Sequence, residues 1–194
     1  MGCGKNGTFD KIPDVNQWAI MLVHNGQLVE NNNVSILGKF ISMWIHLFAK
    51  ESFTILLKPI AGHGKWDNQE PFGKLDGKFE YQGRVATLTR ATIRLNKMKF
   101  FWKHVAPVAS QMNDAKGFIF SVGIGEVPWI KQATFSVWES VEDMKAFAYS
   151  MKEHSEVVKK TRSENWYSED LFVRFSIKDS FGTINDTNPL SIKP

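Results

Sequence analysis

Cysteine is almost missing from this sequence: the 194 residues contain one, Cys3. A single thiol excludes an intramolecular disulfide, and it excludes a zinc or iron–sulfur site built from several cysteines of the chain. Chains without disulfides are typical of reducing compartments, so a cytoplasmic location is expected. The start MGCGKNG lacks the apolar segment of a signal peptide, and Asn6 occupies the position where a myristoylation signal has Ser or Thr.

Long apolar runs and blocks of like charge are missing as well. The most apolar stretch, residues 36–50, is interrupted by Lys39, His46 and Lys50, and it is too short to span a bilayer. The net charge is +4, but basic residues stand among acidic ones, as in EDMK and KTRSE. This distribution is typical of a solvated surface, so nucleic-acid binding is not expected. A weak peripheral attraction to anionic membranes stays open.

Several short catalytic and nucleotide-binding motifs are also absent. The sequence contains no GxxxxGK[ST] phosphate loop, no GxSxG nucleophile elbow and no HExxH zinc motif. The stretch GIGEVP at 123–128 lacks the third glycine of a dinucleotide-binding turn. The sequence therefore offers no support for these hydrolase and nucleotide-dependent classes.

Aromatic residues, by contrast, are abundant, with fifteen Phe and seven Trp. Hydrophobic residues make up 43% and charged residues 23% of the chain, as in an ordinary globular protein. Ordinary core packing explains most of these rings, but they also permit a ring-rich ligand pocket. The length suffices for one large domain or two small fused ones.

The spacing of apolar residues predicts strands and helices that alternate along the chain. The predicted strands are residues 18–24, 53–60, 85–95, 117–125, 133–138 and 170–177. The predicted helices are residues 36–50, 97–112 and 140–163. The glycine-bearing residues 61–73 are expected to form a long irregular loop.

Three local features refine the predicted helices. The first helix carries one broad apolar face and is expected to pack. Pro107 is expected to kink or divide the second helix. Ser140 is a candidate N-cap for the third, with Asp143 three residues later in a weaker form of the capping box.

The order of elements predicts the fold class. Residues 85–177 follow the order β-α-β-β-α-β of a complete ferredoxin-like unit. Residues 17–84 resemble part of a second such unit, and the polar residues 1–16 and 178–194 are expected to be poorly ordered tails. We therefore predict an α+β protein of ferredoxin-like repeats that form an α+β barrel of the dimeric type.

Several stretches together resemble the spheroidene monooxygenase family. They are ATLTRATIR at 86–94, GIGEVP at 123–128, QATFSVWES at 132–140, MKAFAY at 144–149 and NWYSEDLFVRF at 165–175. The loop GHGKWDNQEPF at 62–72 also resembles that family, so the likeness covers residues 53–177. It implies a monooxygenase that uses haem b, dioxygen and an external electron donor to insert a keto group into an acyclic carotenoid.

A more distant resemblance concerns the third predicted helix. The pattern VWES, then Met144 and Phe147, then a histidine, is similar to haem monooxygenases of the IsdG type, which are dimeric α+β barrels. It implies that His154 is the axial iron ligand and that Phe147 lies over the haem face, with Met151 and Trp138 completing the surround. Glu169 or Asp170 could hold the second imidazole nitrogen. The alternative is a half-exposed helix histidine.

The other histidines carry weaker hypotheses. His104 lies at the edge of an apolar helix face and is the second candidate for the iron ligand. His63 stands between two glycines and fits a loop or the mouth of a pocket. His24 and His46 are interpreted as structural residues.

Two arginines and one glutamate are further site candidates. Arg90 lies in a strand of small and apolar residues, where it could bind a haem propionate or pair with a nearby acid at the surface. Arg174 offers the same two readings, as a ligand of the cofactor or as an ion-pair partner. Glu126, in the loop of GIGEVP, could deliver protons to dioxygen or stabilise a turn.

Other functions stay open at this stage. The chain could be another haem enzyme, either haem-degrading or similar to aldoxime dehydratases, a cofactor-free monooxygenase, or a non-catalytic barrel that binds small molecules. The expected partners are an apolar substrate, dioxygen and an electron-donor protein. The chain is shorter at its N-terminus than the family it resembles, so a homodimer is expected to supply the absent sheet edge.

Overall fold

The computed structural model describes residues 2–3, 9–24, 38–75, 81–150, 160–161 and 163–191. The elements, in chain order, are β1 (Gly2–Cys3), β2 (Pro13–Asp14), α1 (Gly38–Phe48), β3 (Phe53–Gly64), β4 (Val85–Ile93), the 3-10 helix η3 (Leu95–Lys97), α2 (Met98–Met112), β5 (Phe118–Val127), β6 (Lys131–Trp138), α3 (Val141–Ser150) and β7 (Tyr167–Gly182). None of the helices in these ranges is long and apolar enough to cross a membrane.

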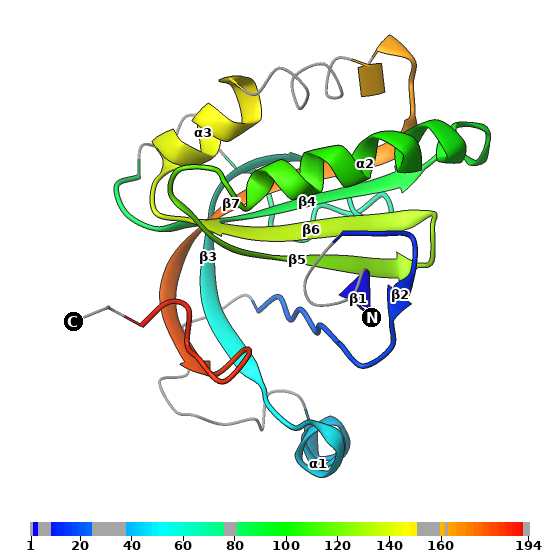
Figure 1. Ribbon diagram of the computed structural model, residues 1–194. Helices are drawn as coiled ribbons and strands as arrows, with labels where there is room; N and C mark the ends of the chain where they lie inside the picture. Colours follow the sequence, from blue (N-terminus) through cyan, green and yellow to red (C-terminus); the bar gives the residue numbers. More distant parts are fainter. Residues whose placement is uncertain are drawn as a thin grey trace.

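One antiparallel sheet contains all the strands, in the order β2-β1-β5-β6-β4-β7-β3. Within it, the segment β4-α2-β5-β6-α3-β7 places its strands in the order β5-β6-β4-β7, which is the ferredoxin-like arrangement. Both helices of this unit cover the same face of the sheet (Figure 1). The predicted α+β fold with a complete ferredoxin-like unit is therefore confirmed.

Strand alternation separates the core into two faces. In β4, Val85 belongs to the cluster beneath α3, whereas Ala86 and Leu88 belong to the cluster on the opposite side. We call the side toward α2 and α3 the helix face and the other side the inner face. On the inner face Phe53 of β3 meets Phe120 of β5 at 5.9 Å between ring centres, so the sheet curves back on itself.

The third predicted helix begins as the sequence indicated. The Ser140 hydroxyl accepts the backbone N–H of Asp143 at 3.0 Å and donates to the Asp143 carboxylate at 2.7 Å. The Ser140 hydroxyl thus accepts an N–H of the first helical turn, which confirms Ser140 as the N-cap, while Asp143 binds the capping hydroxyl and not the backbone N–H of a full capping box. The structure describes α3 over Val141–Ser150, and residues 151–159 of the predicted helix lie outside the described ranges.

The second predicted helix differs in one respect. α2 runs without a break from Met98 to Met112, so Pro107 does not divide it. Phe101 and Trp102 of α2 are buried with Trp166.

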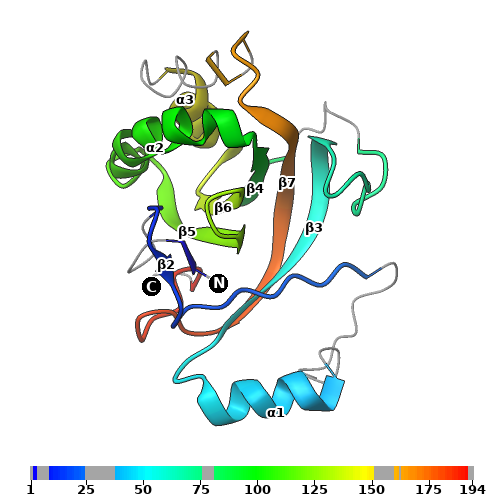
Figure 2. The same ribbon diagram turned by 90° about the vertical axis from the view of Figure 1, so that its right-hand side faces the viewer.

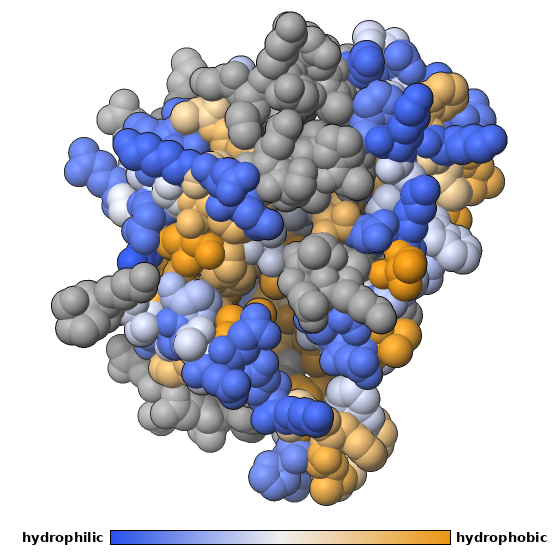
Figure 3. All heavy atoms as spheres, viewed as in Figure 1, coloured by the Kyte–Doolittle hydropathy of each residue, from blue (hydrophilic) through white to orange (hydrophobic). Residues whose placement is uncertain are grey.

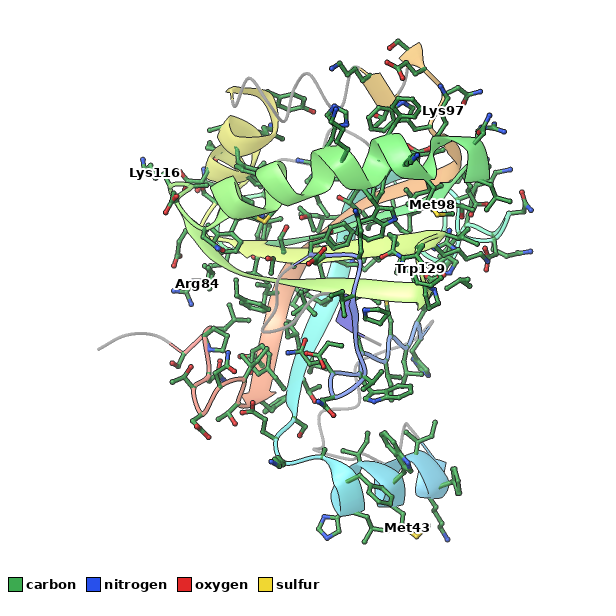
Figure 4. The ribbon with its side chains drawn as sticks, turned by 45° about the vertical axis from the view of Figure 1, so that its right-hand side comes forward. Met43, Arg84, Lys97, Met98, Lys116 and Trp129 are labelled. Carbon is green, nitrogen blue, oxygen red and sulfur yellow. The ribbon has the colours of Figure 1, made fainter. Side chains whose placement is uncertain are left out.

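Described parts of both predicted tails pack against the rest of the molecule. Phe9 stacks on Trp102 at 5.7 Å, and the carbonyl of Lys11 accepts the indole N–H of Trp129, which lies at the turn between β5 and β6 (Figure 4). At the other end β7 continues to Gly182, and Leu190 is buried in the inner-face core. A few well-placed apolar residues therefore anchor these parts of otherwise polar segments.

The N-terminal half departs most from the predictions. Residues 18–24 form no strand, and Trp18, Leu22 and Val23 are at least half exposed. α1 forms as predicted but buries none of its residues. Its Trp44 meets Trp18 edge-on at 5.7 Å between ring centres, so α1 packs only partly. Figure 2 shows α1 standing away from the sheet, Met43 points outward in Figure 4, and apolar side chains gather at this end of the molecule in Figure 3.

Candidate functional site

Arg90 is the centre of a charged cluster on the inner face. Alternation along β4 places it on the same side as Ala86 and Leu88, and its exposed fraction is 0%. Its Nε and Nη2 donate to the two oxygens of Glu126, each at 2.9 Å. Nη1 donates to Glu169 at 2.8 Å, so one guanidinium holds two carboxylates from different strands.

Two more charged residues complete this group. The Nη2 of Arg90 also donates to Asp67 at 2.9 Å, and Nζ of Lys131 donates to the same Asp67 oxygen at 2.7 Å. We call Asp67, Arg90, Glu126, Lys131 and Glu169 the Arg90 cluster. Its members come from β4, β5, β6, β7 and the turn after β3, so the cluster connects four strands and a turn.

An indole covers the guanidinium. The ring centre of Trp66 lies 5.0 Å from Cζ of Arg90, which is cation–π distance. Trp66 itself packs against the inner-face core. The charged cluster is therefore closed on this side by an aromatic ring.

The cluster favours the charged forms of Arg90, Glu169 and Asp67. Burial acts to lower the pKa of Arg90, but the hydrogen bonds and charge of Glu126, followed by Glu169 and Asp67, outweigh it and raise that pKa. Burial also acts to raise the pKa of Glu169, but two backbone N–H groups and Arg90 shift it below its ordinary value. The pKa of Asp67 is lowered mainly by Lys131. Arg90 and Glu169 are thus poor proton donors near neutral pH.

The turn after β3 is tight and regular, where the sequence predicted a long irregular loop. β3 continues to Gly64, and Trp66 and Gln69 then exchange two backbone hydrogen bonds of 2.9 and 3.0 Å. Asp67 and Asn68 between them have φ of 50° and 62°, as in a type I′ turn. Glu169 accepts their two N–H groups at 2.8 and 2.7 Å.

The helix face carries a second group of candidate residues. Trp138 of β6 and Phe147 of α3 pack at 5.2 Å between ring centres, and both are buried. The indole N–H of Trp138 donates to the hydroxyl of Ser136 at 3.0 Å, and Ser136 shares a 2.7 Å hydrogen bond with Thr87. A buried polar pair therefore lies beside an aromatic surface under α3.

Arg174 also belongs to the helix face. It lies opposite Thr87 of β4 and Ala61 of β3 in the ladder, and its side chain is half-buried. The two arginines predicted for the site thus lie on opposite faces of the sheet. The structure brings Arg90 together with Glu126. It brings Trp138 together with Phe147, on the same face as Arg174. It does not bring these two groups together.

The predicted iron ligand His154 and its neighbour Met151 lie outside the described residues. His104 on α2 is half-buried; its Nδ1 is 2.7 Å from the carbonyl of Phe100, and its ring lies 5.4 Å from Trp166. In the described ranges no group of three or more His, Cys, Asp or Glu side chains could hold a metal ion.

The remaining histidines lie in different surroundings. His63 is exposed on the helix face, with its ring 5.8 Å from that of Phe172. It lies within β3 and not in the loop that the sequence predicted. His24 and His46 are exposed.

Sequence reasoning missed two members of the cluster, Asp67 and Lys131, and gave two others a different place or partner. Glu126 lies in β5, not in a loop, and Glu169 binds Arg90 on the inner face. The Asp67-Asn68 pair is a turn signal that could have located the hairpin. Nothing local marks Lys131, because its partner is distant in sequence.

The strand order, and the two helices that cover one face of the sheet, define the class of the protein: it is an α+β protein with a ferredoxin-like core. No family model matches the chain. Among solved structures it is similar to SnoaB from Streptomyces nogalater, described as a cofactor-independent oxygenase, with a TM-score of 0.37 and 14% identity. That match covers 55% of this chain and 98% of the other, and likeness at this level says nothing about activity.

Sequence comparison identifies closer relatives. The chain is 32% identical over 190 residues to the spheroidene monooxygenase of Cereibacter sphaeroides, a match that covers 97% of this chain and 58% of that protein. It is 29% identical over 193 residues to the spheroidene monooxygenase of Rhodobacter capsulatus, with 99% and 79% covered. The chain is therefore a relative of the spheroidene monooxygenases, which confirms the resemblance seen in the motifs. It spans little more than half the length of the first of them.

Proposed function

We propose that this chain forms part of a monooxygenase of the spheroidene monooxygenase type, acting on an acyclic carotenoid or a similarly apolar substrate with haem b as its cofactor. The observation that carries the proposal is the similarity to proteins of that name over 97% of the chain. An electron-donor protein and a homodimer belong to the same proposal.

The helix face is the proposed location of the cofactor and substrate. Trp138 and Phe147 supply an apolar aromatic surface there, and Arg174 supplies a cation on the same face that suits a propionate. The Thr87 and Ser136 hydroxyls add a polar point that could orient an oxygen-bearing group. Pockets for apolar ligands commonly combine such surfaces with a few polar groups.

Among the described residues, His104 has the chemistry that a haem ligand requires. The Nδ1 of His104 faces the Phe100 carbonyl, so this nitrogen carries the proton and Nε2 is left as the electron-pair donor that iron requires. His154 is the ligand favoured by the resemblance, and His104 is the alternative. When bound, haem supplies the site at which dioxygen is activated.

The Arg90 cluster has a different proposed part. It lies on the opposite face from Trp138, and its guanidinium is already engaged by three carboxylates. We therefore assign it to holding β4, β5, β7 and the turn after β3 in register, as a positioning group. The delivery of protons by Glu126, with Arg90 as its catalytic partner, stays a prediction.

Haem titration tests the cofactor. Purified chain supplemented with haem should show a Soret band that shifts on reduction and on addition of carbon monoxide. His154→Ala should abolish these shifts, and His104→Ala, a histidine change on the neighbouring helix, should leave them. Loss with His104→Ala alone would move the ligand to α2, and a spectrum like that of free haem with the unaltered chain would contradict haem binding.

A product assay tests the reaction. The chain, with haem, a reducing system and an acyclic carotenoid, should give a product that has gained one oxygen and lost two hydrogens, as mass spectrometry can detect. The same product without haem would favour a cofactor-free oxygenase. No product, with a carotenoid that nevertheless binds, would favour a non-catalytic binding protein.

A further inference from the structure

β3 and β7 are related by an internal two-fold axis. Their antiparallel ladder is symmetric about the pair Lys58 and Ser176: Phe53 pairs with Gly182 at one end, and Gly64 pairs with Leu171 at the other. The irregularities in the ladder, next to Leu56 and next to Pro59, fall at equivalent places on the two sides. The two strands are thus equivalent elements of two repeats.

The turns that follow the two strands are equivalent as well. Residues 66–69 and 184–187 each close with paired backbone hydrogen bonds, and both central residues have φ between 50° and 62° in each turn. Glu169 accepts the N–H groups of the first turn, and Glu51 accepts those of Asn185 and Asp186 in the second, at 2.9 and 3.2 Å. Glu51 and Glu169 occupy the same position in their repeats.

A glycine at the equivalent position before each turn permits the same close approach of two backbone segments. Gly64 and Gly182 both have positive φ, and a Cβ on either would collide with a carbonyl, of Asp170 in one repeat and of Ser52 in the other. The next N–H along the chain donates to that same carbonyl, at 2.9 and 3.0 Å. The two-fold relation therefore extends through strand, glycine and turn.

The two repeats differ at their outer edges. β7 is covered along its outer edge by β4, where Arg90 stands opposite Leu171 and reaches Glu169. In the part of the chain that the structure describes, no strand covers the outer edge of β3, and no cation lies against Glu51. Among the described residues, none stands at the position equivalent to β4 and its arginine.

We propose that the outer edge of β3, over residues 51–58, binds an extended strand of a separate polypeptide that has the pattern of β4. This strand runs antiparallel to β3, presents small or apolar side chains to the inner face, and carries an arginine or lysine opposite Phe53. That position is the two-fold equivalent of Arg90 opposite Leu171. The cation then reaches Glu51, and main-chain hydrogen bonds supply the affinity, as in other cases of strand addition.

The charge of Glu51 favours a strand of the β4 type over a second copy of the chain as the occupant of this edge. A homodimer formed by two β3 edges would bring Phe53, Ile55 and Leu57 of each copy to the shared inner face, and none of these side chains is a cation. Glu51 would again have no basic partner. A strand of the β4 type supplies one, and it would also extend the sheet beside the exposed α1.

A labelled peptide with the sequence RVATLTRATI, taken from residues 84–93, is the probe. Fluorescence anisotropy with the intact chain should show saturable binding. Replacing the second arginine of the peptide by Glu should weaken binding about tenfold, the loss expected for one charge-assisted hydrogen bond. Glu51→Gln in the protein should do the same, whereas Glu142→Gln, an exposed carboxylate on α3, should not.

A charge exchange and a mapping experiment complete the test. Glu51→Lys should restore binding of the Glu-containing peptide, and hydrogen exchange should show peptide-dependent protection of amides 52–58 only. Circular dichroism checks that each variant is folded. The proposal would be overturned if the peptide did not bind, or if binding did not depend on the arginine. It would also be overturned, in favour of a second copy of the chain, if a sample of dimeric mass showed protection of β3 without peptide.

Discussion

β3 and β7 have the same backbone form and very different surroundings. Leu171, Val173 and Phe175 of β7 are at most 3% exposed, whereas their two-fold equivalents in β3 are partly exposed. Both strands pass through a glycine into a type I′ turn whose N–H groups a glutamate accepts. Local sequence is thus enough to form the strand and its turn, but burial depends on a second neighbouring strand, which in the described ranges lies beside β7 and not beside β3.

The charged surroundings of the two capping glutamates differ in the same way. Two backbone N–H groups lower the pKa of Glu51, while burial opposes them. Glu169 has the equivalent pair of N–H groups and, in addition, the buried Arg90. The repeat that has a β4 neighbour therefore gains an ion pair that the other repeat lacks.

The largest effect is expected from truncating an inner-face side chain in each strand. Phe175→Ala should lower the free energy of unfolding by about 3–5 kcal/mol, because it leaves a cavity in a closed core. Leu57→Ala, at the two-fold equivalent position, should cost only about 1–2 kcal/mol, because Leu57 is already partly exposed. Urea unfolding measures both. Equal costs would contradict the view that β3 is incompletely covered.

Removing the central cation should have the next largest effect. Arg90→Met should destabilise the fold by about 2–4 kcal/mol at pH 7, because it leaves three carboxylates close together without their shared cation. The loss should shrink as pH falls, since protonation relieves that repulsion. Urea unfolding at pH 7 and at pH 4.5 gives the comparison. Lys116→Met, which breaks the surface pair of an exposed lysine with Asp143, is the control and should cost less than 1 kcal/mol, on the order of a surface ion pair.

The smallest effects are expected from the capping glutamates. Glu169→Gln should lower the melting temperature more than Glu51→Gln does, because only Glu169 also binds Arg90. The pKa values of both carboxyls are lowered, so the stability they contribute is present above their ordinary values and is lost as pH falls through the lowered ones. Each variant should therefore lose part of the acid sensitivity of the unaltered chain. Identical melting shifts for the two variants would show that Arg90 adds nothing to the Glu169 cap.

Periodicity predicted the C-terminal repeat well and the N-terminal one poorly. Residues 85–177 contain the complete β-α-β-β-α-β order, and each strand and helix there has neighbours that agree with its own pattern. Residues 18–24 have the composition of a strand, but the described structure gives them no strand to pair with. A pattern shows what a segment can bury, not whether a partner is present.

The candidate site was likewise predictable from the sequence only in part. Arg90 and Glu126 stand out in sequence as charged residues among small and apolar ones, and the structure joins them. The alternation of strand residues separates Arg90 from Arg174, although both were proposed for one cofactor. That separation depends on strand register, which composition does not reveal.

The sequence by itself determined the strand and helix order of residues 85–177, the capped start of α3 and the similarity to the spheroidene monooxygenases, because these depend on local spacing and on matching strings of residues. Only the tertiary structure decided which charges meet around Arg90, which face each arginine occupies, and that β3 repeats β7 without a second neighbouring strand among the described residues. These depend on contacts between residues far apart in the chain, where a change of one position in register moves a side chain to the other face of the sheet.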